Sequence, residues 1–341
     1  MSETIGVGLI GYGLAGKAFH APLIAATPGL RLAAVASSRP AEVAEQHPDA
    51  VVHADPAALI ADPAVALVVI ASPNDSHAPL ASAALRAGKA VVVDKPMATS
   101  VPEAEALVAL ARETGQLFSV FHNRRWDDDF LALSALVKAG TLGDIGLVES
   151  RFDRFRPQVQ DRWRERAGVA TGIWWDLGPH LLDQALQLFG PPETLTADLA
   201  IQRRGGDAID YFNVTLAYGA MRVVLAGGSL MADPPPWFSV QGSGGAFVTH
   251  GMDGQEAMLR AYPGRPQPTP PRDARLTGAD GVTTLYRLPP GNWGAYYAAI
   301  RDALSGDGPN PVTGEEALTI MRGLELAEES SRSGRRLDWR Y

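Results

Sequence analysis

Residues 5–16 read IGVGLIGYGLAG, a short apolar strand that runs directly into the spacing Gly-x-Gly-x-x-Gly. In this pattern the first glycine permits a tight turn, the second lets the backbone approach a pyrophosphate, and the third allows close packing of the following helix, whose N-terminus faces the phosphates. Since 35 of the 341 residues are glycine, the spacing has weight mainly because a strand precedes it and a helix follows it. We predict a dinucleotide-binding turn at Gly11, Gly13 and Gly16. A glycine turn that binds no nucleotide is the alternative.

Strand-like and helix-like stretches alternate over the first 122 residues. The strand-like runs are rich in Val and Ile, which is typical of a parallel sheet covered by helices on both faces. Alternation at this spacing indicates right-handed βαβ units, so we predict an α/β Rossmann domain over residues 1–122. The expected strands are 5–11, 30–37, 66–72, 90–94 and 117–121, and the expected helices are 15–26, 40–46, 56–61, 77–87 and 99–114.

The pattern changes after residue 122. Period-two alternation predicts antiparallel strands, so we expect residues 123–341 to form an α+β domain with an open, mostly antiparallel sheet, whose last helix is able to pack back on the first domain. Five prolines make residues 262–273 an expected exposed loop. The expected strands are 147–155, 194–203, 211–218, 222–230, 238–241 and 246–250, with helices at 130–139, 176–189, 293–305 and 314–333.

One face of this sheet must pack on helices, and we expect apolar residues on the other face as well. Val214 and Leu216, spaced two apart, and Val223 and Leu225 are examples. Because a large exposed apolar sheet face is unusual in a monomer, the sequence predicts a homodimer or homotetramer.

The composition excludes several kinds of site and partner. With no cysteine, the chain has no disulfide scaffold, thiolate metal site or cysteine nucleophile. A net charge of −8 disfavours nucleic-acid binding, and the longest apolar run, residues 64–71, is too short to span a membrane. The N-terminus is polar and acidic, without a visible signal peptide. We expect a cytoplasmic protein with a small-molecule partner and no metal.

The second expected strand ends in Ser37-Ser38-Arg39. Sites that prefer NAD usually carry an Asp or Glu here, which binds the ribose 2′-hydroxyl. Two hydroxyls and a guanidinium suit a 2′-phosphate instead, so the sequence predicts NADP rather than NAD. A solvated arginine at a strand end is the alternative.

Two further expected strands end in polar residues at the edge of the sheet where ligands bind in doubly wound folds. Asn74, within Ser72-Pro73-Asn74-Asp75-Ser76-His77, is placed to contact a cofactor, although Asn-Asp-Ser is also ordinary helix-capping chemistry. Lys95, within Asp94-Lys95-Pro96, follows apolar strand residues, and a partly buried lysine can act as a donor or proton relay. The alternative for Lys95 is an ordinary surface lysine.

A third cluster lies on the helix expected at 176–189. Asp176, His180 and Asp183 are spaced i, i+4 and i+7, which puts them on one helix face. Because Pro179 belongs in a first helical turn, we expect Asp176 at the helix start. A carboxylate and an imidazole on one face can form a proton-transfer pair, with a buried core histidine as the alternative. A single local histidine without a second ligand spacing argues against a metal.

Together these motifs resemble the glucose-fructose oxidoreductase/inositol dehydrogenase family, Gfo/Idh/MocA, over nearly the whole chain. The matching residues are the Gly11 fingerprint, Ser72-Pro73-Asn74 with His77, Asp94-Lys95-Pro96, and Asp176 with His180. Asp94 stands where the family usually has a glutamate. Residues 121–126 and 176–184 look most like the branch that contains the NADP-dependent scyllo-inositol dehydrogenases.

The resemblance implies an NADP-dependent dehydrogenase acting on a secondary alcohol of a sugar or cyclitol such as an inositol, with Lys95, Asp176 and His180 as catalytic residues. Hydroxyl recognition would also depend on side chains such as Arg154, Arg162 and Asp183. The expected cofactor contacts are Gly11, Tyr12, Gly13, Leu14, Ala15, Gly16, Ser37, Ser38, Arg39, Ser72, Pro73, Asn74, His77, Asp94 and Lys95. The expected substrate contacts are Lys95, Arg125, Trp126, Trp163, Asp176 and His180.

Two other hypotheses keep this fold. One is a sensor or regulatory protein that binds NADP without catalysis, which loss of the lysine or the histidine would support, and both residues are present. The other is a lyase or hydrolase that uses the nicotinamide for transient oxidation. Net NADPH formation, no turnover, or turnover without net reduced cofactor distinguishes the three hypotheses.

Overall fold

The computed structural model describes residues 4–262 and 266–341, apart from the side chain of Trp163. Its contacts divide the chain into two compact units. The first contains the chain up to Trp126, together with Gly254–Thr269 and Asn292–Leu318, and the second contains Asp127–Asp253, Pro270–Gly291 and Thr319–Tyr341. The chain therefore returns to the first unit twice, where the sequence led us to expect one boundary after residue 122.

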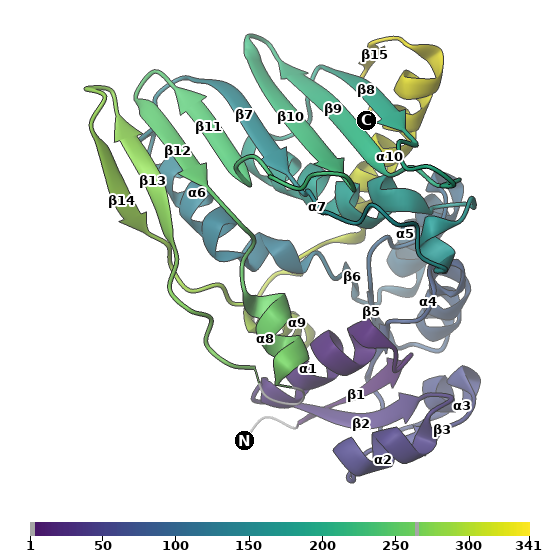
Figure 1. The fold of residues 1–341 in the computed structure, drawn as a ribbon. Helices are drawn as coiled ribbons and strands as arrows, with labels where there is room; N and C mark the ends of the chain where they lie inside the picture. The colour runs from purple at the N-terminus through teal and green to yellow at the C-terminus, as the bar shows by residue number, and fades with distance from the viewer. Residues whose placement is uncertain (1–3, 263–265) are drawn as a thin grey trace. The chain divides into compact units, whose positions relative to one another are not determined.

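A parallel sheet forms the centre of the first unit, with the strand order β3-β2-β1-β4-β5-β6 (Figure 1). The strands β4 and β5 are buried along their whole length, as the apolar runs predicted. The Rossmann prediction is therefore confirmed. The bounds are β1 Ile5–Ile10, β2 Leu30–Ala36, β3 Val51–His53, β4 Leu67–Ile70, β5 Ala90–Val93 and β6 Phe118–Val120. Only β3 was not predicted among these, because it has three residues that are all partly or fully exposed.

The helices of the first unit largely follow the predicted ranges. α2 and α3 begin with proline at the first helical position, where its missing N–H costs no hydrogen bond. The bounds are η1 Gly16–His20, α1 Ala21–Ala26, α2 Pro40–Gln46, α3 Pro56–Ala61, η2 Asn74–Ser76, α4 His77–Arg86, α5 Val101–Thr114, η3 Asn123–Trp126, α8 Gln255–Ala261 and α9 Gly294–Ser305.

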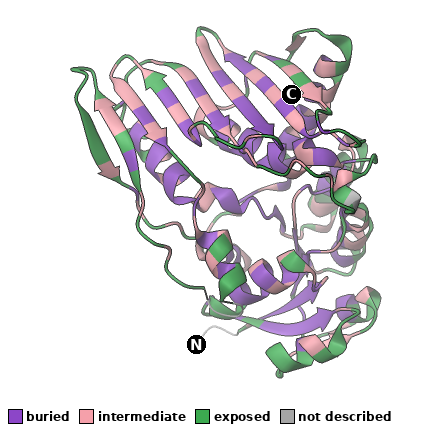
Figure 2. Ribbon diagram, in the orientation of Figure 1, coloured by how far each residue is buried: buried purple, intermediate pink, exposed green. Residues whose placement is uncertain are grey.

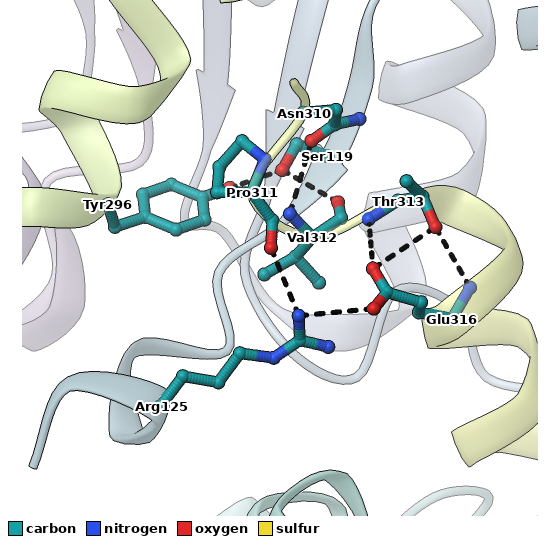
Figure 3. Close-up of polar contacts among 8 residues, drawn as sticks. All are labelled: Ser119, Arg125, Tyr296, Asn310, Pro311, Val312, Thr313 and Glu316. Carbon is teal, nitrogen blue, oxygen red and sulfur yellow. Dashed lines mark hydrogen bonds and ion pairs between the residues drawn. The ribbon is translucent and has the colours of Figure 1, made fainter. Parts of the chain in front are cut away.

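A segment from late in the chain, residues 310–316, attaches to β6 at the edge of the parallel sheet (Figure 3). Ser119 forms a bridge with Thr313, and its hydroxyl donates to Val312 O at 2.8 Å. The same hydroxyl lies 2.8 Å from Tyr296 Oη of α9. Asn310 Nδ2 donates to the carbonyl oxygen of the residue before Ser119, also at 2.8 Å. The polar groups at this sheet edge are thus satisfied by residues almost 200 positions further along the chain.

A larger sheet forms the second unit, with the strand order β14-β13-β12-β11-β7-β10-β9-β8-β15 (Figure 1). Strands β7 and β10 pair in parallel, and the other neighbouring pairs are antiparallel, so the predicted mostly antiparallel sheet is confirmed. The bounds are β7 Ile145–Arg151, β8 Thr194–Ala200, β9 Tyr211–Tyr218, β10 Met221–Gly228, β11 Phe238–Gly242, β12 Gly245–Thr249, β13 Asp273–Gly278, β14 Thr283–Arg287 and β15 Leu337–Asp338. The helices are α6 Asp128–Lys138, η4 Trp163–Glu165, α7 Gly172–Phe189 and α10 Gly314–Ser333, of which α10 belongs to this unit from Thr319 onward.

The expectation that Val214, Leu216, Val223 and Leu225 lie on an exposed sheet face is wrong. All four are buried in the single chain, because Leu216 pairs with Val223 and Val214 with Leu225 on the face that packs against α7. Burial alternates along β9 and β10 accordingly (Figure 2). Period two shows which residues share a face, but it does not show which face is covered.

A cluster of carboxylates lies at the start of α6. Asp129 is fully buried, and within the described residues neither of its carboxylate oxygens has a hydrogen-bond partner. Burial, followed by the negative charges of Asp127 and Asp128, raises the pKa of Asp129 well above its usual value. Asp128, by contrast, has hydrogen-bond partners. Its Oδ1 accepts hydrogen bonds of 2.6 Å from Asp129 N and from Arg272 Nη1.

Replacing Asp129 with asparagine is expected to stabilise the protein at neutral pH. An aspartate whose pKa is raised on folding lowers stability once the pH exceeds its unfolded value of about 3.9. The gain from Asp129→Asn should therefore be small near pH 4 and grow as the pH rises toward 8. Thermal unfolding across this range measures it. Asp128→Asn is the matched comparison. Burial and the charge of Asp253 raise the pKa of Asp128 as well, but this change also weakens the ion pair with Arg272, so its gain should be smaller than that of Asp129→Asn. A gain independent of pH would contradict the assignment.

Candidate active site

The fingerprint turn has the backbone that each of its glycines was predicted to provide. Gly11 has a φ of +95°, and a Cβ there would lie 2.7 Å from Ala71 O of the neighbouring strand end. A Cβ on Gly16 would collide with Gly11 O, so this glycine lets the helix pack against the turn. A Cβ on Gly13 would meet nothing within 4 Å. The open space beside Gly13 is where a pyrophosphate can approach the backbone.

A cavity of about 310 Å³ lies along this turn in the first unit. It is bordered by the ends of β1, β2 and β4, which is the edge where doubly wound sheets bind nucleotides. Its size, the open approach at Gly13 and the hydroxyl-rich wall fit the adenosine part of a dinucleotide. The lining residues are Ile10, Gly11, Tyr12, Gly13, Ala36, Ser37, Ser38, Arg39, Ala54, Pro56, Ser72, Ser76 and Leu80.

The loop after β2 presents no carboxylate to this cavity. Ser37 Oγ accepts a hydrogen bond from Arg39 N at 3.0 Å, and Arg39 Nη1 lies 3.4 Å from Tyr12 O. Tyr12 itself is buried, with its hydroxyl donating to Gln46 Oε1 at 2.9 Å. Burial, assisted by the charge of Glu42, raises the pKa of Tyr12 to about 12. Tyr12 therefore lines the cavity with its backbone, and the guanidinium of Arg39 provides a positive charge there.

His77 links the loops that follow β4 and β5. Its ring is buried, with Nδ1 2.8 Å from Pro96 O and Nε2 2.9 Å from Ser72 O. Both ring nitrogens thus contact backbone carbonyl groups, so His77 positions these two loops. Its contact with the cofactor stays a prediction. Ser72 Oγ lies 2.5 Å from Ser76 Oγ, while Asn74 is buried in η2.

The motif Asp94-Lys95-Pro96 follows β5 in the first unit, with Lys95 half-buried. Asp94 Oδ1 accepts a hydrogen bond from Lys95 N at 2.8 Å, and Asp94 Oδ2 lies 3.8 Å from Nε2 of the buried His20. Burial alone would raise the pKa of Asp94, but its interactions with His20, Lys95 and His77 outweigh burial and lower it to about 2. His20 Nδ1 in turn lies 2.6 Å from Tyr297 Oη. Asp94 is therefore a fixed carboxylate next to the lysine.

In the second unit, α7 carries Asp176, His180 and Asp183 on one face, as predicted. His180 and Asp183 are buried, whereas Asp176 keeps about a quarter of its side chain exposed. Arg154 Nη1 lies 3.3 Å from Asp176 Oδ2, and Arg164 Nε lies 3.8 Å from Asp176 Oδ1. Two guanidiniums thus stabilise the negative charge one helical turn before His180.

The Phe152 ring packs against Arg154 and lies near His180. Its ring lies 5.0 Å below the guanidinium of Arg154 and 6.5 Å from the ring of His180, with the two ring planes 30° apart. Phe152 is buried, and it packs edge-on against Trp237 at 4.6 Å. An apolar wall therefore borders the imidazole, which limits the access of water to it.

The expectation that Asp176 begins the helix is wrong. α7 starts at Gly172, so Asp176 lies in the second turn and Pro179 lies inside the helix. The first turn is held by Trp174 and Trp175, whose ring N–H groups donate to Leu324 O at 3.1 Å and Glu328 Oε1 at 2.6 Å. These tertiary contacts stabilise the helix by more than it loses through the backbone hydrogen bond that Pro179 cannot make.

Comparison with known proteins identifies the family. A model of the oxidoreductase family with an NAD-binding Rossmann fold, GFO_IDH_MocA, matches residues 5–122, and the model of that family's C-terminal alpha/beta domain matches residues 134–338. The chain belongs to the Gfo/Idh/MocA oxidoreductase family.

Similar proteins of known sequence or structure span nearly the whole length of the chain. Uncharacterized oxidoreductase YdgJ of Escherichia coli is 50% identical and covers 97% of this chain and 98% of its own. The scyllo-inositol 2-dehydrogenase (NADP(+)) IolW of Bacillus subtilis is 39% identical over 98% of this chain and 95% of its own. A solved oxidoreductase structure from Yersinia pestis is 47% identical, with a TM-score of 0.93 over 99% of this chain and 98% of that one. The chain is therefore an oxidoreductase with an NAD(P)-binding Rossmann domain.

Three other residues were predicted to touch substrate, and the structure places them as follows. Arg125 Nη1 donates to Pro311 O at 3.0 Å and to Glu316 Oε1 at 3.3 Å, so it fastens residues 310–316 to the first unit (Figure 3). The Trp126 ring packs edge-on against Tyr296 at 5.7 Å. The backbone of Trp163 begins η4, and its side chain lies outside the described residues. Substrate contact by these three stays a prediction for this Gfo/Idh/MocA member.

Sequence reasoning missed His20 and Phe152. His20 is four residues after Gly16 on a helix that, apart from Lys17, is otherwise apolar, which is the signal that could have shown it to face a buried polar partner. Phe152 carries no such signal, because an aromatic residue on a strand usually belongs to the core. Within residues 4–262 and 266–341, no group of three His, Cys, Asp or Glu residues is arranged to hold a metal ion. No helix in these ranges is long and apolar enough to cross a membrane.

Proposed function

We propose that this protein is an NADP-dependent dehydrogenase or reductase that acts on a secondary alcohol, or the corresponding ketone, of a sugar or cyclitol. The observation that carries the proposal is the placement of Asp176 and His180 one turn apart on α7, in a chain with an NAD(P)-binding Rossmann domain. The similarity to IolW, whose name states an inositol substrate and NADP, supports the cyclitol class.

The nicotinamide, when bound, accepts a hydride from carbon and with it the electron pair of the broken C–H bond. The alcohol oxygen must lose its proton in the same reaction, and His180 is the residue suited to accept it. Asp176, which pairs with Arg154 and Arg164, lies one helical turn before His180 and stabilises the imidazolium that forms. Lys95 donates a hydrogen bond to the same oxygen and stabilises its developing negative charge. In the reverse direction His180 returns the proton.

A panel of polyols, cyclitols and sugars screened for NADP reduction at alkaline pH tests this proposal. We expect NADPH and a ketone product to appear in equal amounts. Turnover without net NADPH would indicate the lyase or hydrolase. Tight NADP binding without turnover of any compound would indicate the sensor.

The cofactor preference is expected to depend on the loop after β2. Wild-type protein should bind NADP more tightly than NAD, and Arg39→Ala should reduce this preference about tenfold by removing a charge-assisted contact at an exposed site. Ser37→Asp should reverse the preference, because its carboxylate repels a 2′-phosphate and binds a 2′-hydroxyl. The aspartate can still accept the hydrogen bond from Arg39 N. Dissociation constants for both cofactors at fixed ionic strength measure the effect.

Arg31→Ala is the control for the loss of an arginine, since Arg31 is exposed on β2. It should leave both dissociation constants unchanged. Equal affinity of the wild-type protein for NAD and NADP would show that Arg39 is only a solvated charge.

The oligomeric state remains part of the proposal, as a homodimer or homotetramer. The sheet face opposite α7 presents a row of half-buried, mixed residues that pair across neighbouring strands, including Thr215, Val224, Glu149 and Ser239. Such a mixed surface suits a hydrated interface between copies. Light scattering at micromolar concentration tests it, and a strictly monomeric mass would refute it.

A further inference from the structure

A second cavity of the first unit adjoins the nucleotide cavity along the fingerprint turn. It measures about 390 Å³ and shares Gly13 and Arg39 with the first cavity. Three cations from three separate elements line it, namely Lys17 of η1, Arg39 of the loop before α2 and Arg260 of α8. Glu42 of α2 contributes one carboxylate. The lining thus has an excess of positive charge in a chain whose net charge is −8.

Glu42 connects two of these cations. Its Oε1 lies 2.5 Å from Lys17 Nζ, and its Oε2 lies 3.7 Å from Arg39 Nη1. The hydrogen bond from Lys17 lowers the pKa of Glu42, so the carboxyl stays ionised at neutral pH. All three side chains are partly exposed, and their ion pairs can therefore exchange partners without unfolding the surrounding helix.

Arg260 contacts a different carboxylate and an aromatic ring. Its Nη2 lies 2.5 Å from Glu256 Oε1, and its guanidinium lies 5.9 Å from the ring centre of Phe19. Glu256 also pairs with Arg124 at 3.0 Å. Since one carboxylate is shared by two guanidiniums, Arg260 adds to the positive balance of the cavity.

We propose that this second cavity is the subsite for the 2′-phosphate of NADP, with Lys17 as a specificity-determining cation beside Arg39 and Glu42 as the carboxylate that the phosphate displaces. The inference rests on the NADP preference proposed above. Arg39 lines both cavities, so a phosphate that binds Arg39 borders the wall that carries Lys17. A phosphate monoester has nearly two negative charges at pH 7, which matches Lys17, Arg39 and Arg260 set against Glu42. It is also a stronger partner for both cations than a single carboxylate.

Binding of 2′,5′-ADP and 5′-AMP, measured by isothermal titration calorimetry, tests the subsite because the two ligands differ only in the 2′-phosphate. We expect wild-type protein to prefer 2′,5′-ADP. Lys17→Met should weaken 2′,5′-ADP binding about tenfold and leave 5′-AMP binding unchanged, whereas Lys17→Arg should keep most of the preference. Glu42→Gln should tighten 2′,5′-ADP binding several-fold. Inorganic phosphate should compete with 2′,5′-ADP in wild type, and less in Lys17→Met.

Lys138→Met, which removes an exposed lysine from the second unit, is the matched control and should change neither affinity. If Lys17→Met keeps the full preference while Arg39→Ala loses it, the subsite is wrong and the NADP assignment stands. Equal weakening of both ligands in Lys17→Met would show a general effect on the fingerprint turn and would also overturn the subsite. If wild-type protein binds both ligands alike, the subsite and the NADP preference both fail, whereas the dehydrogenase activity is judged by the substrate screen.

Discussion

Alanine in place of His180 is expected to lower turnover of the true substrate by at least about 100-fold, because a positioned acid–base group supplies roughly 10² to 10⁴ in rate. Lys95→Ala should cause a loss of the same order, since it removes the donor that stabilises the negative charge on the reacting oxygen. Affinity for the cofactor should be retained in His180→Ala. Steady-state turnover at saturating cofactor, together with cofactor titration, separates the two effects.

The exposed His250 provides the matched control for loss of a histidine. His250→Ala should turn over the substrate at the wild-type rate. Near-native turnover in His180→Ala or in Lys95→Ala would remove that residue from the mechanism, even if the other variant were inactive.

The second large effect is expected for stability. Trp174 is fully buried in α7, packs against Phe212 of β9 with ring centres 5.1 Å apart, and donates to Leu324 O of α10 at 3.1 Å. Trp174→Ala should cost roughly 3 to 5 kcal/mol of the free energy of unfolding, from the cavity and the lost hydrogen bond. The corresponding thermal transition should fall by about 10 °C or more. Differential scanning calorimetry measures it.

Trp174→Phe should lose less, because the ring contact with Phe212 is kept. Phe155→Ala removes an aromatic ring that is 59% exposed and should leave the transition within about 2 °C of wild type. A Trp174→Ala transition unchanged from wild type would show that α7 is not held by this side chain.

Most of the parallel sheet was predictable because strands such as β4 and β5 are continuous apolar runs that are followed by polar residues. The hairpin of β13 and β14 was not predictable in the same way, since its residues are mostly exposed and Leu285 has 76% of its surface in solvent. Edge strands bury little, so they need little apolar patterning. Their pairing is decided by the neighbouring strand rather than by their own sequence.

Parts of the candidate site were likewise predictable from the sequence, and other parts were not. Local spacing was enough to predict the turn at Gly11, Gly13 and Gly16, because the positive φ of Gly11 and the close approach of Gly16 to Gly11 O belong to the turn itself. The start of α7 was misjudged, since two tryptophans that pack on α10 keep Pro179 within the helix. Arg154 could be named but not placed, because its partner Asp176 lies 22 residues away in the sequence.

The attachment of residues 310–316 to β6 and of α9 to His20 has a consequence for synthesis. The nucleotide-binding half of the chain is translated first, yet His20 and Tyr297 are 277 positions apart in the sequence. Until those residues leave the ribosome, Ser119 and Phe121 lack their later partners and remain at an open sheet edge. The first unit therefore gains its last contacts after most residues of the second unit have been made.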